Sequence, residues 1–167
     1  MKLLSCAAFA LTLSTTSALA IDPCLVGQWE VDGQSLADAM GAQMGGSARH
    51  DGGSANLQIS DAGDMSMTID DLVITAQMPD VPPMAITISG ASQGTLSADD
   101  NDYIADVTDY ALVGSADVMG TRMDIPITTA DGGGWGQSRG NFRCSDDVLT
   151  FVPDAPGSIP PSWTRVR

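Results

Sequence analysis

One serine lies in the pattern that is typical of a hydrolase nucleophile. Residues 136–140 read Gly-Gln-Ser-Arg-Gly, which matches G-x-S-x-G with Ser138 at its centre. In an α/β-hydrolase this pattern forms a sharp turn between a strand and a helix, and the catalytic His follows the Ser along the chain. Here the single His, His50, precedes Ser138, and no helical pattern follows the motif. We therefore interpret the match as chance in a chain rich in Gly and Ser. We predict no catalytic residue and no enzymatic activity.

Aspartates form three short runs that could bind a cation or act as a carboxylate pair. Residues 99–102 read Asp-Asp-Asn-Asp, and hard oxygen ligands suit calcium, but the run lacks the Gly and the distal Glu of an EF-hand loop. We interpret it as a turn between strands. The pairs at residues 70–71 and 146–147 would point to opposite faces if they lay in strands, because the side-chain period is two. We predict no metal site and no cofactor, although the sequence leaves calcium binding by the Asp-rich turns open.

The first twenty residues have the features of an export signal. Lys2 precedes an apolar run, and residues 18–20 read Ala-Leu-Ala, the small-x-small pattern of a signal peptidase site. The run is shorter than the roughly 20 apolar residues that a membrane-spanning helix needs. We predict that residues 1–20 are a cleaved signal peptide. Residues 21–167 would then be a single exported domain, periplasmic or secreted, that does not insert into a membrane.

Two cysteines remain after cleavage, because Cys6 lies in the signal. Cys24 and Cys144 would then be in an oxidising compartment, where a lone pair of cysteines most simply forms a disulfide. A zinc site is the weaker interpretation, since two cysteines and one His do not supply four ligands. We predict a disulfide between Cys24 and Cys144.

The charges exclude two classes of partner. Loss of Lys2 takes the formal net charge from −14 to −15 and leaves only Arg as cations, whereas Glu30 and many Asp supply the acids. Binding of phosphate groups draws its affinity from Lys and Arg. We therefore expect neither nucleic acid nor anionic lipid headgroups as partners. We interpret the acidic surface as a solvated one that keeps an exported monomer in solution.

Apolar residues alternate with polar ones along most of the chain, which predicts β-strands. The alternation changes phase at residues 70–71, which indicates a bulge, and Pro126 requires an edge or bulge position in its strand. Closely spaced hairpins favour one all-β domain, an up-and-down antiparallel barrel of about eight to ten strands, over a sandwich. The expected strands cover residues 25–31, 55–59, 65–78, 84–89, 94–97, 103–107, 111–119, 122–128, 139–144, 148–152 and 163–166.

One stretch has helical spacing instead. Residues 32–44 carry apolar side chains at intervals of four, which predicts a short amphipathic helix after the first strand, with Asp32 or Ser35 as its N-cap. Glycines at positions 41, 45 and 46 are expected to end it. The residues that follow, through position 53, are expected to form a loop in which His50 is exposed.

Three sequence patterns resemble the signatures of the lipocalins. Gly-Gln-Trp ends at Trp29 in the first strand, Thr-Asp-Tyr contains Asp109 and Tyr110 between two late strands, and Arg165 lies on the last strand. The resemblance implies that these residues are structural and lie at the closed end of a barrel. It also implies that Arg165 stacks over Trp29, where a cation–π contact contributes about 0.5 to 2 kcal/mol.

Two features depart from a lipocalin proper. A lipocalin has a helix after its last strand, whereas this chain stops at residue 167. Its expected helix follows the first strand, which is closer to the fatty-acid-binding branch of the calycin superfamily. The resemblance is therefore to the calycins as a group, and with the export signal it describes an exported bacterial protein.

The interior of the expected barrel is the basis of the functional prediction. A barrel of about eight strands is just wide enough to be filled by its own side chains or to hold one small ligand. Methionine thioethers fill irregular cores and also line adaptable binding surfaces. We predict binding or carriage of a small apolar ligand in the cell envelope; the alternative is a structural or protein-interaction module with a solid core. The residues expected to line the cavity are Met65, Met67, Ile74, Met84 and Ile86.

Overall fold

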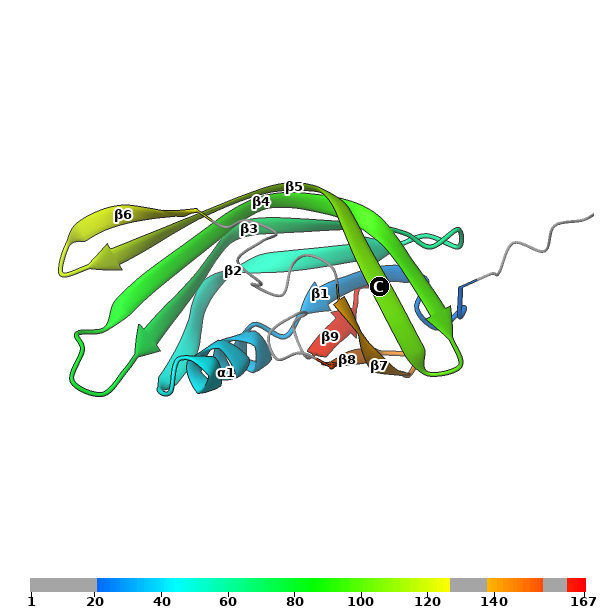
Figure 1. Cartoon of the computed structure of the whole chain (residues 1–167), viewed down its shortest axis with the longest axis horizontal. Coiled ribbons are helices and arrows are strands. Elements are labelled where there is room, and N and C mark those ends of the chain that lie inside the picture. Colours follow the sequence, from blue (N-terminus) through cyan, green and yellow to red (C-terminus); the bar gives the residue numbers. More distant parts are fainter. Residues whose placement is uncertain (1–20, 127–137, 155–161) are drawn as a thin grey trace, which may run out of the picture.

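The computed structural model describes residues 21–126, 138–154 and 162–167 (Figure 1). The expected signal peptide, residues 1–20, lies outside the described residues. The described chain contains one helix and nine strands: β1 (Gly27–Val31), α1 (Gly33–Gln43), β2 (Ser47–Ile59), β3 (Asp64–Gln77), β4 (Met84–Asp99), β5 (Asp102–Val118), β6 (Thr121–Pro126), β7 (Ser138–Cys144), β8 (Val148–Pro153) and β9 (Ser162–Arg165).

Eight of these strands close into a barrel in which all neighbours are antiparallel. The order around the barrel is β1, β2, β3, β4, β5, β7, β8 and β9, and β9 pairs with β1 to complete it. β6 stands outside this ring and forms a hairpin with the end of β5. The predicted all-β up-and-down barrel with one short helix after the first strand is confirmed.

One wall of the barrel is much longer than the other. Strands β2 to β5 have 13 to 17 residues each, whereas β1, β7, β8 and β9 have four to seven. Along the edge away from β4, β5 pairs first with β7, through residues 102–105, and later with β6, through residues 113–118. The long strands therefore continue past the closed barrel as an arched sheet, and α1 lies under its concave side (Figure 1).

The helix begins where the sequence predicts. The Asp32 side chain accepts hydrogen bonds from the backbone amides of Gln34 and Ser35, so Asp32 is the N-cap. Gly41 was expected to help end the helix, which is wrong because α1 continues to Gln43. A Cβ at position 41 would lie 2.6 Å from the backbone nitrogen of Ala48, so glycine there lets α1 approach β2 closely.

Bulges join segments that the sequence pattern separates. The stretch expected as a loop through residue 53 is the first half of β2, with register shifts on both sides of Gly52. Gly53 has φ +77°, and a Cβ there would meet the carbonyl of Asp71, which itself has φ 42°. The bulge predicted at residues 70–71 is confirmed by the register shift between Ile69 and Leu72. These paired irregularities interrupt the two strands at the same level of the sheet.

Two other expected breaks are also absent. The segments expected at residues 84–89 and 94–97 form the single strand β4, and those at 103–107 and 111–119 form β5. A register shift between Gln93 and Gly94 accommodates one extra residue of β5, Thr108. Pro126 ends β6, which pairs with β5 along one edge among the described residues, as expected for a proline in a strand.

Aromatic side chains fill the closed barrel. Trp29, Trp163, Tyr103 and Phe151 are among the largest fully buried side chains. Tyr103 and Phe151 contact each other edge to face, with ring centroids 4.8 Å apart. The predicted disulfide is confirmed: it links Cys24, before β1, to the end of β7. Within the described parts of the chain, no helix has the length and apolar character needed to cross a membrane.

Candidate functional site: the closed end and the apolar interior

Trp29 and Arg165 form a stacked pair at one end of the barrel. They are register partners on β1 and β9, and the guanidinium carbon of Arg165 lies 4.0 Å from the centroid of the Trp29 ring. The Trp29 side chain is 0% exposed, and its Nε1 donates a hydrogen bond to the Leu25 carbonyl at 2.9 Å. The contact expected between the two side chains is therefore present.

Main-chain carbonyls fix the Arg165 guanidinium in this position. It donates to the carbonyls of Cys24 at 2.7 Å, Val26 at 2.8 Å and Asp146 at 2.7 Å. Gly27 has φ +141°, and a Cβ there would lie 2.5 Å from the guanidinium. The Gly of the Gly-x-Trp pattern thus leaves room for the cation. These carbonyls and the indole face already engage Arg165, and the structural role that the resemblance implies for it stays a prediction.

The Thr-Asp-Tyr pattern lies elsewhere than expected. It was placed between two strands, but it lies inside β5, next to the bulge opposite Gly94. The strand continues through it because the bulge absorbs the unpaired Thr108. Asp109 is exposed, and Tyr110 is half-buried opposite Ser92. The structural role that the resemblance implies for Asp109 and Tyr110 stays a prediction.

The five predicted lining residues separate into two groups. Met65 and Met67 lie in the barrel, where Met67 shares a register row with Leu57 and so with Trp29. Met65 packs against the core and also borders a surface depression of about 490 Å³ whose other lining residues are polar or Gly.

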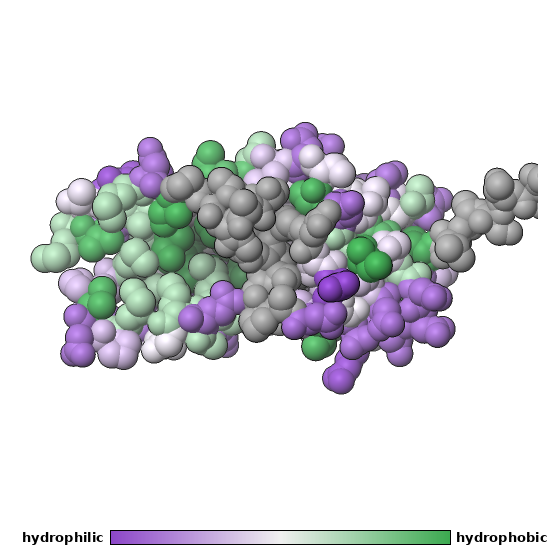
Figure 2. All heavy atoms as spheres, viewed as in Figure 1, coloured by the Kyte–Doolittle hydropathy of each residue, from purple (hydrophilic) through white to green (hydrophobic). Residues whose placement is uncertain are grey.

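The other three lining residues lie in the arched part of the sheet. Ile74 and Ile86 are register partners and are buried, and Met84 is half-buried beside Ala76. Figure 2 shows apolar residues gathered around a hollow at the left of the view, where the long strands extend past the closed barrel. All three lie on the concave face of β3 and β4, beyond the bulge at residues 70–71 and away from the register row of Trp29.

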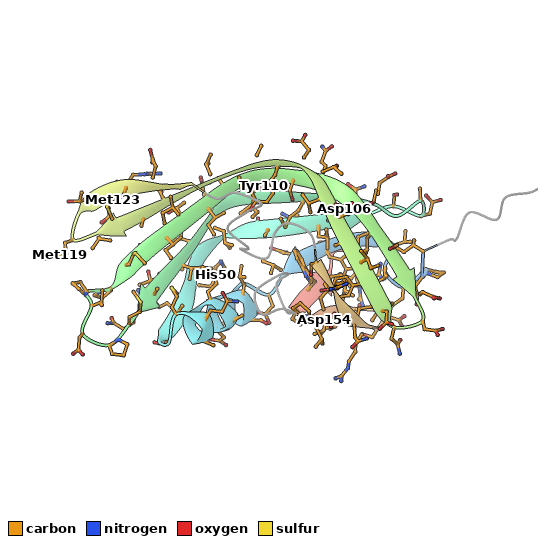
Figure 3. The ribbon with its side chains drawn as sticks, viewed as in Figure 1. His50, Asp106, Tyr110, Met119, Met123 and Asp154 are labelled. Atoms are coloured by element: carbon orange, nitrogen blue, oxygen red, sulfur yellow. A yellow bond between two sulfur atoms is a disulfide. The ribbon has the colours of Figure 1, made fainter. Side chains whose placement is uncertain are left out.

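His50 is a residue of the concave side that the sequence pattern misses. It was expected to be exposed in a loop, but it is half-buried in β2, in register with Ile74 (Figure 3). Its Nε2 lies 3.3 Å from the Gly53 carbonyl, and a Cβ at Gly33 would clash with its ring. Glycine 33 therefore lets α1 cover the imidazole. Ala48 and His50 are two residues apart, which is a local sign that both side chains point to the same face of β2. The bulges at the following glycines obscure this sign.

Ser138 lies in a strand and has a structural partner. It is the first residue of β7, its side chain is buried, and its Oγ lies 2.9 Å from the hydroxyl of Tyr103. Burial raises the pKa of the Tyr103 hydroxyl above its ordinary value. A strand position is not the strand-to-helix turn that a nucleophile elbow requires. Residues 136–137 of the G-x-S-x-G match lie outside the described residues, and Ser138 itself takes part in a buried hydrogen bond.

We expect Ser138→Ala to lower the free energy of unfolding by about 1 to 3 kcal/mol, because it leaves the buried Tyr103 hydroxyl without this partner. Adding Tyr103→Phe should recover part of this loss, since both polar groups are then gone. Urea unfolding of the single and double variants measures both effects. Covalent labelling of Ser138 by a fluorophosphonate would contradict the structural role.

The acidic runs occupy turns and bulges. Residues 99–102 form the turn between β4 and β5, as predicted. Asp70 and Asp71 are both exposed, at the bulge that interrupts the alternation of the strand. The pair at residues 146–147 lies between β7 and β8. In the described part of the chain, no group of three or more His, Cys, Asp or Glu is placed to hold a metal ion.

Comparisons with known proteins add no relative. A scan against protein-family models and searches of curated proteins and solved structures found no match. The barrel and its single helix are consistent with a calycin-like fold.

Proposed function

We propose that this chain is an exported, calycin-like protein that binds or carries a small, apolar and uncharged molecule in the cell envelope. The observation that carries the proposal is the difference between the two walls. The long strands extend an apolar concave face, with Ile74 and Ile86, beyond the closed barrel. The Trp29–Arg165 pair occupies the opposite end. An apolar lining with few polar groups is typical of small-molecule sites.

The distribution of arginines supports an uncharged ligand. Arg165 is engaged by carbonyls at the closed end, and the other five arginines are exposed. A carboxylate moved into the apolar interior without a cation would carry a large desolvation penalty. The disulfide supports export, because such bonds persist in oxidising compartments.

The test is a fluorescence titration of residues 21–167 with N-phenyl-1-naphthylamine, a neutral apolar probe. We expect one-to-one binding and an affinity at least about tenfold weaker in Met84→Glu, because a carboxylate on the concave face opposes apolar binding. The matched control is Ala85→Glu, the next residue along β4, whose side chain points to the other face. No binding by the unsubstituted protein, or equal losses in both variants, would contradict the proposal.

A second function is favoured by the β5–β6 hairpin. Met119 is 83% exposed at its tip with φ 53°, and Met123 is 51% exposed (Figure 3). Exposed methionines are common on protein-binding surfaces. A structural or protein-interaction module of the envelope is therefore the alternative. Two results together would favour this alternative: the unsubstituted protein does not bind the probe, and Met119→Ser abolishes its binding to an envelope protein.

A further inference from the structure

A buried donor inside the barrel lacks an acceptor. Trp163, on β9, is 1% exposed, and its Nε1 has no hydrogen-bond partner among the described residues. The other buried indole at this end behaves differently, since Trp29 donates to Leu25 at 2.9 Å. Buried polar groups in native proteins are nearly always paired, so an unpaired one calls for a ligand, a water or an ion.

The residues beside Trp163 on the two neighbouring strands are apolar. Its register partners are Val31 on β1 and Leu149 on β8, both buried. Arg165 lies two residues further along β9, toward the closed end, and its guanidinium already donates to three main-chain carbonyls. Trp163 pairs with Val31, two residues beyond Trp29 along β1, so it lies two residues further into the barrel than the stacked pair.

We propose that the Trp163 indole N–H is the polar anchor of the ligand site, and that it donates to the carbonyl or ether oxygen of an apolar, uncharged molecule. This inference rests on the proposed function and deepens it. One donor in an apolar environment selects for one acceptor, because a matched oxygen satisfies the indole while a hydrocarbon leaves it unpaired. Ketones, esters and ethers fit this requirement, and free carboxylates do not, since the Arg165 cation is engaged elsewhere.

The experiment compares two molecules of the same shape. Acetophenone has a carbonyl oxygen where α-methylstyrene has a methylene group, so the pair differs in the acceptor alone. Each is added to ¹⁵N-labelled residues 21–167, and the indole N–H resonances are followed by NMR. Trp163→Phe assigns the resonance, and the Trp29 indole serves as the control because Leu25 already accepts from it.

We expect acetophenone to move the Trp163 indole proton downfield and α-methylstyrene to leave it nearly unchanged. Trp163→Phe should weaken acetophenone binding about fivefold to tenfold and leave α-methylstyrene binding unchanged, since only the former loses a hydrogen bond. If Trp163→Phe is poorly folded, Trp29→Phe and Trp135→Phe assign the third indole resonance by elimination, so spectra of the unsubstituted protein still test the anchor.

The outcomes separate the two proposals. An unshifted Trp163 indole proton, in protein that binds N-phenyl-1-naphthylamine, would overturn the anchor and leave the proposed function standing. A long-lived water that stays bonded to the indole in the presence of acetophenone would also overturn it. A protein that binds neither the probe nor acetophenone would overturn the proposed function and this inference together.

Discussion

Replacing Trp29 with alanine is expected to lower the free energy of unfolding by about 3 to 5 kcal/mol, the usual cost of truncating a large buried aromatic side chain. The indole is fully buried and covered by the Arg165 guanidinium. Its loss leaves a cavity and removes one face of the cation's environment. Urea unfolding followed by circular dichroism measures the change.

A matched control shows whether the loss of stability depends on the burial of the truncated side chain. Val113→Ala truncates an apolar side chain on β5 that is 66% exposed, and we expect a change within about 0.5 kcal/mol. A double-mutant cycle with Arg165→Met isolates the stacking contact, for which we expect a coupling of about 0.5 to 2 kcal/mol. Zero coupling, or a loss below about 1 kcal/mol in Trp29→Ala, would remove the structural role assigned to this pair.

Loss of the Cys24–Cys144 disulfide is the second large effect. The bond joins residues 120 positions apart, and closing a loop of that length contributes about 4 to 5 kcal/mol in the chain-entropy account. The carbonyl of Cys24 also accepts from Arg165, so reduction should loosen the closed end as well. We expect a lower melting temperature on reduction and in the double variant Cys24→Ser and Cys144→Ser.

Thiol titration of the denatured, unreduced protein tests the bond directly. We expect no titratable thiol from Cys24 or Cys144 in residues 21–167. The double serine variant should be insensitive to reductant, which serves as the control. Two thiols per chain would show that the bond does not form.

Local patterns in the sequence were enough to predict much of the fold. The period-two alternation predicts most strands, and the spacing of four predicts α1, because both report which side faces the core. The bulge at residues 70–71 is visible as a change of phase. The partnership of Cys24 with Cys144 follows from the count of cysteines. The contact between Trp29 and Arg165 came from the resemblance to the lipocalins, and the structure shows it.

The tertiary structure decided where strands continue and what the interior contains. A bulge reverses the alternation, so a local pattern reads it as a strand end; only pairing with a neighbour shows that β4 and β5 run on. For the same reason, the sequence pattern did not predict that His50 lies in a strand with its side chain on the concave face. The unpaired Nε1 of Trp163 depends on groups that other strands bring around it. Those contacts are non-local, so no window of the sequence contains them.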